Sequence, residues 1–122
     1  MTQHNQRLGR WGERIAAKWL ERDGWVVRER RWRDGRRDID LIAEREGVVA
    51  FIEVKARSGE QFGDPVEAVH LRKQRELIRA ARVWMARHGV DTAAYRFDVV
   101  GVPLKGRSVW IRHIPSAFEV GR

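Results

Sequence analysis

Residues 37–55 read RDIDLIAEREGVVAFIEVK, and the fold expected for the whole chain is built around this stretch. Polar and apolar residues alternate with period 2 in residues 37–43 and again in 48–55, as in strands whose two faces meet different surroundings. A short loop, Glu46-Gly47, separates the two runs, and its glycine supplies the positive φ of a tight turn. The stretch therefore predicts an antiparallel hairpin.

The register of this hairpin places acids and a lysine on one face. Counting back from the turn sets Asp40 opposite Glu53 and Asp38 opposite Lys55. The other face is wholly apolar: Ile39, Leu41, Ala43, Val48, Ala50, Ile52 and Val54. Carboxylates beside apolar surface need a partner or a metal, and Mg²⁺ is commonly held by one or two carboxylates with water and phosphate oxygens. The alternative is a cross-strand ion pair on a solvated face, which contributes little to stability.

The composition indicates a polyanionic partner. The 122 residues suit one domain, expected to span residues 1–122. Lysine and arginine outnumber aspartate and glutamate by 25 to 17, which gives a net charge of +8 and a pI of about 11.1. Arginine supplies most of the excess and binds phosphate in a bidentate manner, so nucleic acid is the expected partner. A membrane surface is the competing polyanion, but no helix combines a basic face with an apolar one that the core does not need.

Several classes of protein are excluded. The absence of cysteine rules out a disulfide framework and a thiolate metal site. The longest wholly apolar run, residues 48–52, is too short for a signal peptide or a spanning helix, so a cytoplasmic protein is expected. The four histidines lack the spacing of zinc ligands.

The remaining chain predicts helices and strands in the order α-β-β-β-α-β-β. The expected segments are a flexible polar arm (1–6), a helix (7–22), a strand (25–32), the hairpin, a helix (64–88), two strands (95–102 and 109–114) and a flexible tail (116–122). Because a helix separates them, the strand at 95–102 is expected to run parallel to the one at 48–55.

The first helix carries one acid in an otherwise small or apolar row. Glu13 lies beside Gly9, Ala16 and Leu20, and its alternative role is a boundary residue paired with Arg10 or Lys18. Glycines at 9 and 12 cost helix stability, by about 1 kcal/mol each relative to alanine, so they indicate close approach to another backbone or to a ligand.

The second helix has a lysine where its apolar stripe should continue. Asp64-Pro65-Val66-Glu67 has the pattern of a helix start, with a cap, a first-turn proline and an acid. Lys73 interrupts the stripe and Gln74 adjoins it. The lysine either extends to the rim of the core or faces a polar site.

A basic cluster precedes the hairpin. It consists of Arg30, Arg31, Trp32, Arg33, Arg36 and Arg37. Such a cluster can bind a phosphate backbone while Trp32 stacks on a base. The alternative is a solvated basic edge that deters strand pairing.

Four short motifs occur in order along the chain. They are G-x-x-G-E (9–13), D-I-D-L-I-A (38–43), F-I-E-V-K-A-R (51–57) and R-F-D-V-V (96–100). With Lys73-Gln74, they resemble the PD-(D/E)xK nuclease superfamily, within it the Holliday-junction resolvases, and most closely the YraN family of uncharacterised bacterial proteins. Two residues depart from the patterns: Arg37 stands where the superfamily name has proline, and Asp38 where YraN-like sequences more usually have glutamate.

The resemblance covers nearly the whole chain and implies a fold and a chemistry. The fold is α/β, a single restriction-endonuclease-like domain with a mixed central sheet flanked by two main helices. The implied activity is metal-dependent endonuclease cleavage of DNA, of Holliday-junction-resolvase type, although the YraN family itself has no assigned substrate. Asp40 and Glu53 would hold Mg²⁺ or Mn²⁺, Lys55 would orient the attacking water, and Glu13 would hold a water of the metal. Lys73, Gln74 and Asp38 would support this set, and Arg57 joins the nucleic-acid-binding candidates.

Two further functions stay open. A non-catalytic nucleic-acid-binding module or subunit would share the basic surface, but would gain nothing from carboxylates that face phosphates. A protein-interaction domain would not need a charge of +8 for solubility alone. Junction resolvases act as dimers, so a homodimer is also expected, with Trp110, Ile114 and Phe118 as a candidate exposed surface.

Overall fold

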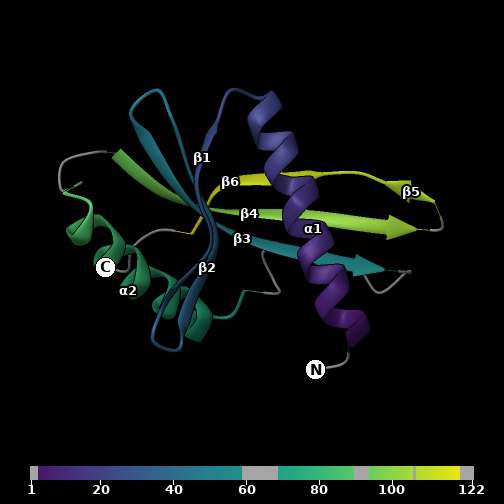
Figure 1. Ribbon diagram of the computed structural model, residues 1–122, viewed down its shortest axis with the longest axis horizontal. Coiled ribbons are helices and arrows are strands. Elements are labelled where there is room, and N and C mark those ends of the chain that lie inside the picture. The colour runs from purple at the N-terminus through teal and green to yellow at the C-terminus, as the bar shows by residue number, and fades with distance from the viewer. Residues whose placement is uncertain (1–2, 59–68, 90–93, 106, 119–122) are drawn as a thin grey trace.

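The computed structural model describes residues 3–58, 69–89, 94–105 and 107–118, which form one mixed sheet and two helices (Figure 1). The elements are α1 (Gln3–Arg22), β1 (Val26–Asp34), β2 (Arg37–Arg45), β3 (Val48–Ser58), α2 (Leu71–Arg87), β4 (Ala94–Lys105), β5 (Ser108–Val109) and β6 (Arg112–Phe118). The strand order is β1-β2-β3-β4, and β4 also pairs with β5 and β6. The predicted α/β class and element order are confirmed, with the last predicted strand divided into β5 and β6. None of the described helices is long and apolar enough to span a bilayer.

The β2–β3 hairpin has the predicted register near its turn. Pairing runs from Arg45↔Val48 to Leu41↔Ile52, and both turn residues have positive φ, 51° for Glu46 and 77° for Gly47. One residue further on, the Asp40 carboxylate accepts a hydrogen bond from the Val54 backbone N–H at 2.8 Å. At the position of the predicted acids, a hydrogen bond to a side chain thus takes the place of backbone pairing between the two strands.

The predicted apolar face of the hairpin is wrong at Ile39. Leu41 and Ala43 pack with α1, whereas Ile39 packs into the cluster beneath α2. Strand β2 pairs with β3 only as far as Leu41, whereas β1 still pairs Trp32 with Ile39 of β2. The first residues of β2 therefore stay with β1 after they have separated from β3.

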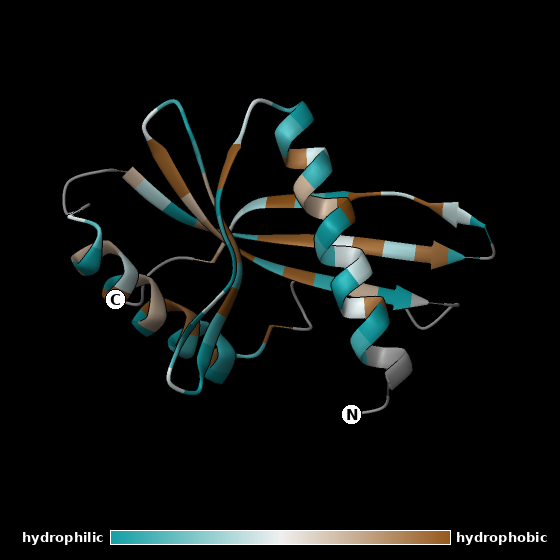
Figure 2. Cartoon of the chain, viewed as in Figure 1, coloured by the Kyte–Doolittle hydropathy of each residue, from teal (hydrophilic) through white to brown (hydrophobic). Residues whose placement is uncertain are grey.

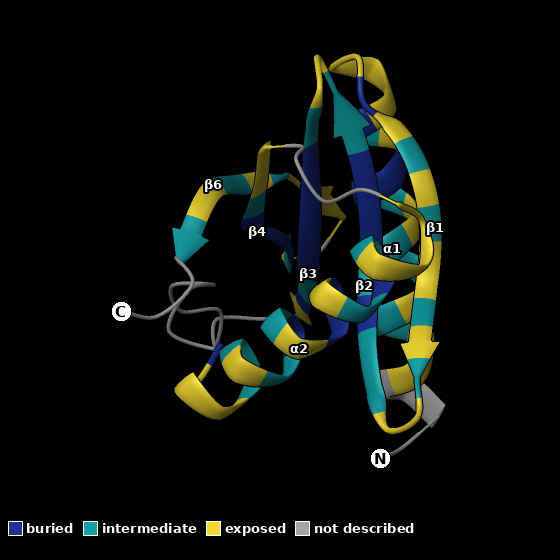
Figure 3. Ribbon diagram, turned by 90° about the vertical axis from the view of Figure 1, so that its left-hand side faces the viewer, coloured by how far each residue is buried: buried dark blue, intermediate teal, exposed yellow. Residues whose placement is uncertain are grey.

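The sheet separates two apolar cores. On β3, Ala50 and Ile52 pack with α1, and the alternate residues Val49 and Phe51 pack with α2. Figure 3 shows β2 and β3 buried along much of their length and β1 largely exposed at the edge, and Figure 2 shows the apolar character of the central strands. The predicted parallel pairing of β3 with β4 is confirmed over eleven residue pairs, from Val48↔Ala94 to Ser58↔Leu104.

Several element boundaries differ from the prediction, and four of them change which residues are helical or paired in a sheet. Helix α1 begins at Gln3, so residues 3–6 of the expected arm are helical, because an existing helix extends readily through polar residues. Helix α2 begins at Leu71 after an extended N-cap at His70, so a continuous helix from residue 64 is wrong, and the expected start itself lies outside the described residues. Strand β4 continues through Pro103, and β6 reaches Phe118, so the expected tail begins within a strand.

The expected dimer surface is only partly exposed. Trp110 is 49% exposed, but Ile114 is half-buried and Phe118 stacks on Phe97 with ring centroids 5.0 Å apart. Phe118 is therefore partly buried against the core beneath α2, and the homodimer stays a prediction.

Gly12 permits close contact between α1 and β3. A Cβ atom at Gly12 would lie 2.6 Å from the Cβ atom of Ala56, whereas a Cβ atom at Gly9 would have no neighbour within 4 Å. The expectation of close approach to another backbone is confirmed for Gly12. At Gly9 no other backbone lies close, and approach to a ligand stays a prediction.

These two glycines predict opposite effects of the same substitution. Gly9→Ala should raise the free energy of unfolding by up to about 1 kcal/mol, because alanine favours the helix and meets no obstacle. Gly12→Ala should lower it by about 1 kcal/mol, because overpacking costs about 1–3 kcal/mol and outweighs the same helical gain. Urea unfolding of both variants measures the difference, and effects of equal sign would contradict the close contact with Ala56.

Candidate active site

Two carboxylates, the half-buried Asp40 and the buried Glu53, meet where the β2–β3 ladder ends. Asp40 and Glu53 lie within hydrogen-bonding range, and the pKa of Asp40 is raised well above its ordinary value by burial, then by the hydrogen bond and negative charge of Glu53. Glu53 is only 4% exposed, and its Oε2 atom has no hydrogen-bond partner among the described residues. A carboxylate pair of this kind requires a shared proton or a cation.

Two lysines lie at the edge of the pair. The Nζ atoms of Lys55 and Lys73 are 3.9 Å and 3.7 Å from Glu53 Oε2. Lys73 also donates a hydrogen bond to Asp38 Oδ1 at 3.2 Å, so Asp38 is paired with α2 instead of the expected Lys55. Burial disfavours the charge on Lys73, but the negative charges of Glu53 and Asp38 outweigh it and raise the pKa of the lysine.

Glu13 approaches the pair from α1. Burial raises its pKa to about 7, assisted by the charge of Asp40 and opposed by that of Arg31. Its ion-pair partner is Arg31 on β1, 3.5 Å away, and not Arg10 or Lys18 of its own helix. The structure therefore places Glu13 near the acids of β2.

The raised pKa of Glu13 predicts a pH-dependent stability in metal-free buffer. A carboxyl with a higher pKa in the folded chain stabilises the fold fully below the unfolded value, here 4.5, and loses that contribution as pH rises through about 7. The glutamine of a Glu13→Gln variant cannot ionise. The difference in unfolding free energy, wild type minus variant, should therefore fall as the pH rises from 4.5 to about 7. Urea unfolding of both proteins across the interval measures it, and a difference that is flat or rises with pH would contradict the shift.

Gln74 holds the chain that enters α2. Its Nε2 atom donates to the backbone carbonyl of Val69 at 3.0 Å, and Val69 is buried in the core beneath α2. This contact fixes the start of the helix that carries Lys73, whereas Lys73 itself contacts the acids.

The basic cluster is partly paired within the molecule. Arg30 lies 3.7 Å from Glu21 and Arg37 lies 3.9 Å from Asp34. Arg57 donates to the carbonyl of Ala56 at 3.0 Å. Arg33 and Arg36 have no ion pair with any residue that the structure describes. The role of these residues in nucleic-acid binding stays a prediction.

Trp32 is not a fully exposed platform. Its side chain is half-buried against the core beneath α2, and the guanidinium of Arg87 lies 5.9 Å from the ring centroid. Stacking on a base would require Arg87 to move or the base to use the remaining ring surface.

Sequence reasoning missed a surface pocket beside this site. The pocket lies between the β1–β2 turn and α2, has a volume of about 380 Å³ and is lined by Asp34, Gly35, Arg36, Arg37, Glu76 and Arg79. Glu76 and Arg79 follow Lys73 at intervals of three residues, the spacing of one side of a helix, which is the signal that could have revealed them.

Sequence reasoning also missed the role of Asp98. The Asp98 side chain is fully buried, lies 2.7 Å from His113 Nε2, and accepts hydrogen bonds from Arg96 at 3.1 Å and from the Ser116 backbone N–H at 3.0 Å. Its neighbours Phe97 and Val99 pack with α2, so Asp98 faces the α1 side of the sheet, opposite Glu53. It holds β4 to β6, and the R-F-D-V-V motif was its signal in the sequence.

The donor set fits a divalent cation held by few protein ligands. Among the described residues, no three acidic or histidine side chains are grouped so that all could hold one ion. Asp40 and Glu53 remain as a pair, and the Oε2 atom of Glu53, which accepts no hydrogen bond among the described residues, suits a cation completed by water and phosphate oxygens.

Sequence comparison finds relatives along nearly the whole chain. The family model described as "Uncharacterised protein family UPF0102" matches residues 12–102. A "UPF0102 protein" of Syntrophotalea carbinolica is 40% identical over 98% of both chains. Proteins of the same description from Myxococcus xanthus and Chlorobium chlorochromatii are 39% and 41% identical, over 95% and 93% of this chain and 92% of each relative.

Proposed function

This chain belongs to the uncharacterised protein family UPF0102, the YraN family, and from that premise and the geometry of the acidic pair we propose that it is a metal-dependent endonuclease of Holliday-junction-resolvase type. The observation that carries the proposal is the Asp40–Glu53 pair, in which the buried Oε2 atom of Glu53 accepts no hydrogen bond and lies between two lysines. Both lysines lie within ion-pair range of this oxygen but too far away to donate a hydrogen bond to it, so the oxygen can still bind a cation. The reaction class is hydrolysis of a phosphodiester bond in nucleic acid, with DNA as the expected substrate.

Each residue of the site has a defined task in this reaction. Asp40 and Glu53 would hold Mg²⁺ or Mn²⁺, which when bound supplies charge stabilisation at the phosphoryl group and lowers the pKa of water. The Lys55 ammonium would orient the attacking water and offset charge that develops on the phosphate. Lys73 holds Glu53 and Asp38 in place. Glu13, with its pKa near 7, could accept or return a proton at its carboxylate.

A cleavage panel tests this function. Four-way junction, single-stranded and duplex DNA, with the same RNA strands, would be incubated with Mg²⁺, Mn²⁺ or EDTA. Metal-dependent cleavage, strongest on the junction, is expected. Binding without cleavage of any substrate would favour the alternative, a nucleic-acid-binding module or subunit, to which the missing third acidic ligand among the described residues lends support.

Binding should be electrostatic and largely independent of sequence. The net charge of +8 and the arginines of β1 suit phosphates, and they lie on a strand and a turn instead of a base-reading helix. We expect affinity for nucleic acid to fall steeply with salt and to vary little between unrelated sequences, measured by fluorescence anisotropy. A flat salt titration, or no binding at low salt, would contradict a basic nucleic-acid surface.

A further inference from the structure

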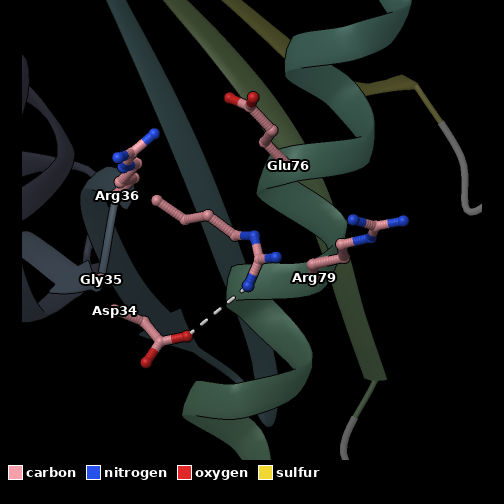
Figure 4. Close-up of a pocket in the computed structure, with 6 residues that line it drawn as sticks. Asp34, Gly35, Arg36, Glu76 and Arg79 are labelled. Atoms are coloured by element: carbon pink, nitrogen blue, oxygen red, sulfur yellow. Dashed lines mark ion pairs between the residues drawn. The ribbon is translucent and has the colours of Figure 1, made fainter.

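The pocket beside the acidic site is formed by two separate segments. Figure 4 shows Asp34, Gly35 and Arg36 of the β1–β2 turn on one side and Glu76 and Arg79 of α2 on the other. Gly35 has φ of 61°, which the tight turn requires. A hollow of about 380 Å³ is large enough for a phosphate group together with part of its sugar.

The acids of this pocket are already paired with arginines. Asp34 Oδ1 accepts a hydrogen bond from Arg87 at 3.2 Å, and Asp34 Oδ2 lies 3.9 Å from Arg37. Glu76 lies 3.8 Å from Arg72 on the outer side of α2. These pairs reduce the negative potential that an entering anion would meet.

Two guanidinium groups remain available. Neither Arg36 nor Arg79 has an ion pair within the ranges that the structure describes, and both are exposed. They belong to different elements and line one hollow, although the Arg79 side chain extends away from the β1–β2 turn in this structure (Figure 4). Guanidinium groups bind phosphate oxygens in bidentate geometry, so the pocket suits a phosphate better than a neutral ligand.

The pocket adjoins the acidic site through both of its walls. Arg37 directly precedes Asp38, which accepts a hydrogen bond from Lys73. On α2, Arg79 lies six residues beyond Lys73, which corresponds to about 9 Å along the helix axis. A nucleic-acid strand that reaches Glu53 can therefore place another of its phosphates here.

We propose that this pocket is a phosphate subsite for the substrate strand, with Arg36 and Arg79 as its cationic groups. The inference rests on the proposed function and adds a fixed position for the strand beside the cleavage site. Arg79 is a binding residue that neither the sequence motifs nor the basic run of β1 contains.

Binding in EDTA tests the subsite separately from cleavage. The probe is a short fluorescent DNA oligonucleotide titrated at several salt concentrations. Arg79→Ala should weaken binding and reduce the slope of log affinity against log salt by about 1, the value for one lost phosphate contact. Arg82→Ala is the matched control, because Arg82 is an exposed arginine of the same helix that does not line the pocket. Glu76→Gln should strengthen binding, because it removes a negative charge from the pocket.

The outcomes separate failure of the subsite from failure of the proposed function. If the wild type binds DNA and Arg79→Ala weakens binding no more than Arg82→Ala, the subsite is refuted while the nuclease proposal stands. If the wild type cleaves nothing but the Arg79 and Glu76 effects appear, the subsite stands and the catalytic role fails. If the wild type does not bind DNA or RNA at low salt, both proposals are refuted.

A second pair of probes identifies the source of the phosphate. Oligonucleotides with a 5′-phosphate and a 5′-hydroxyl would be compared on the wild type and Arg79→Ala. An Arg79 effect of equal size on both supports a phosphate within the strand. An effect limited to the phosphorylated oligonucleotide supports a strand end held in the same pocket. Thermal unfolding of each variant confirms that the protein remains folded.

Discussion

Asp40→Asn and Glu53→Gln are each expected to abolish metal-dependent cleavage while nucleic-acid affinity holds or increases. Each substitution removes a proposed metal ligand from the acidic pair and also removes a negative charge that repels phosphate. Residues that only position metal ligands affect activity by about 10–100-fold, so loss of a ligand itself should exceed about 100-fold. Asn at position 40 can still accept the Val54 N–H, so the fold should persist. Cleavage rates with Mg²⁺ and anisotropy in EDTA measure the two effects.

Two variants of the same hairpin complete the comparison. Glu46→Gln makes the same charge change at the exposed turn and should leave cleavage unchanged. Lys55→Ala subtracts a positive charge beside Glu53, so both rate and affinity should fall. If Asp40→Asn and Glu53→Gln change neither metal binding nor DNA affinity, and the wild type cleaves nothing, the nuclease proposal fails. If they unfold the protein, the two acids are structural partners.

Asp98→Ala is expected to lower the free energy of unfolding by about 3–5 kcal/mol, the cost of breaking a buried charge pair. Without this carboxylate, the Arg96 guanidinium loses its ion-pair partner and the Ser116 backbone N–H loses its hydrogen-bond acceptor. Urea unfolding measures the change.

Asp23→Ala is the matched control for Asp98. Asp23 pairs with Arg45 at 2.8 Å but is about half exposed, so its loss should cost no more than about 1 kcal/mol. Because Asp98 faces the α1 side of the sheet, cleavage by the Asp98 variant at a temperature where it remains folded should equal that of the wild type. Similar stability losses for Asp98→Ala and Asp23→Ala would contradict the account of the buried cluster.

Local sequence patterns predicted the elements of the site better than its contacts. Alternation and the Glu46-Gly47 turn were enough for the hairpin register, because both are properties of neighbouring residues. The end of the ladder at Leu41 was not predictable, because it depends on the Asp40 side chain replacing a backbone partner of Val54. Nor could the pattern show that Arg31, on a different element, pairs with Glu13.

The predicted start of the second helix was wrong for a related reason. The cap pattern at residues 64–67 describes local preference, whereas α2 starts where Val69 is buried and Gln74 binds its carbonyl. The burial of Val69 depends on the rest of the fold, which a local pattern does not contain. The Arg36–Arg79 pocket was unpredictable in the same way, since its walls are distant in sequence and meet only when α2 packs on the sheet.

The parallel pairing of β3 with β4 has a consequence for how the protein forms in time. The β2–β3 hairpin closes across a short turn, so its two acids can come together early. Strand β3 receives its second neighbour only from Ala94 onward, after α2 has crossed over. The segment between β3 and β4 must be ordered, at a cost in conformational entropy, before the β3–β4 contacts can form. Docking of β4 should therefore be the slow step of folding. During synthesis on the ribosome, one edge of β3 therefore has unpaired backbone groups until the residues from 94 onward have emerged and β4 can pair with it.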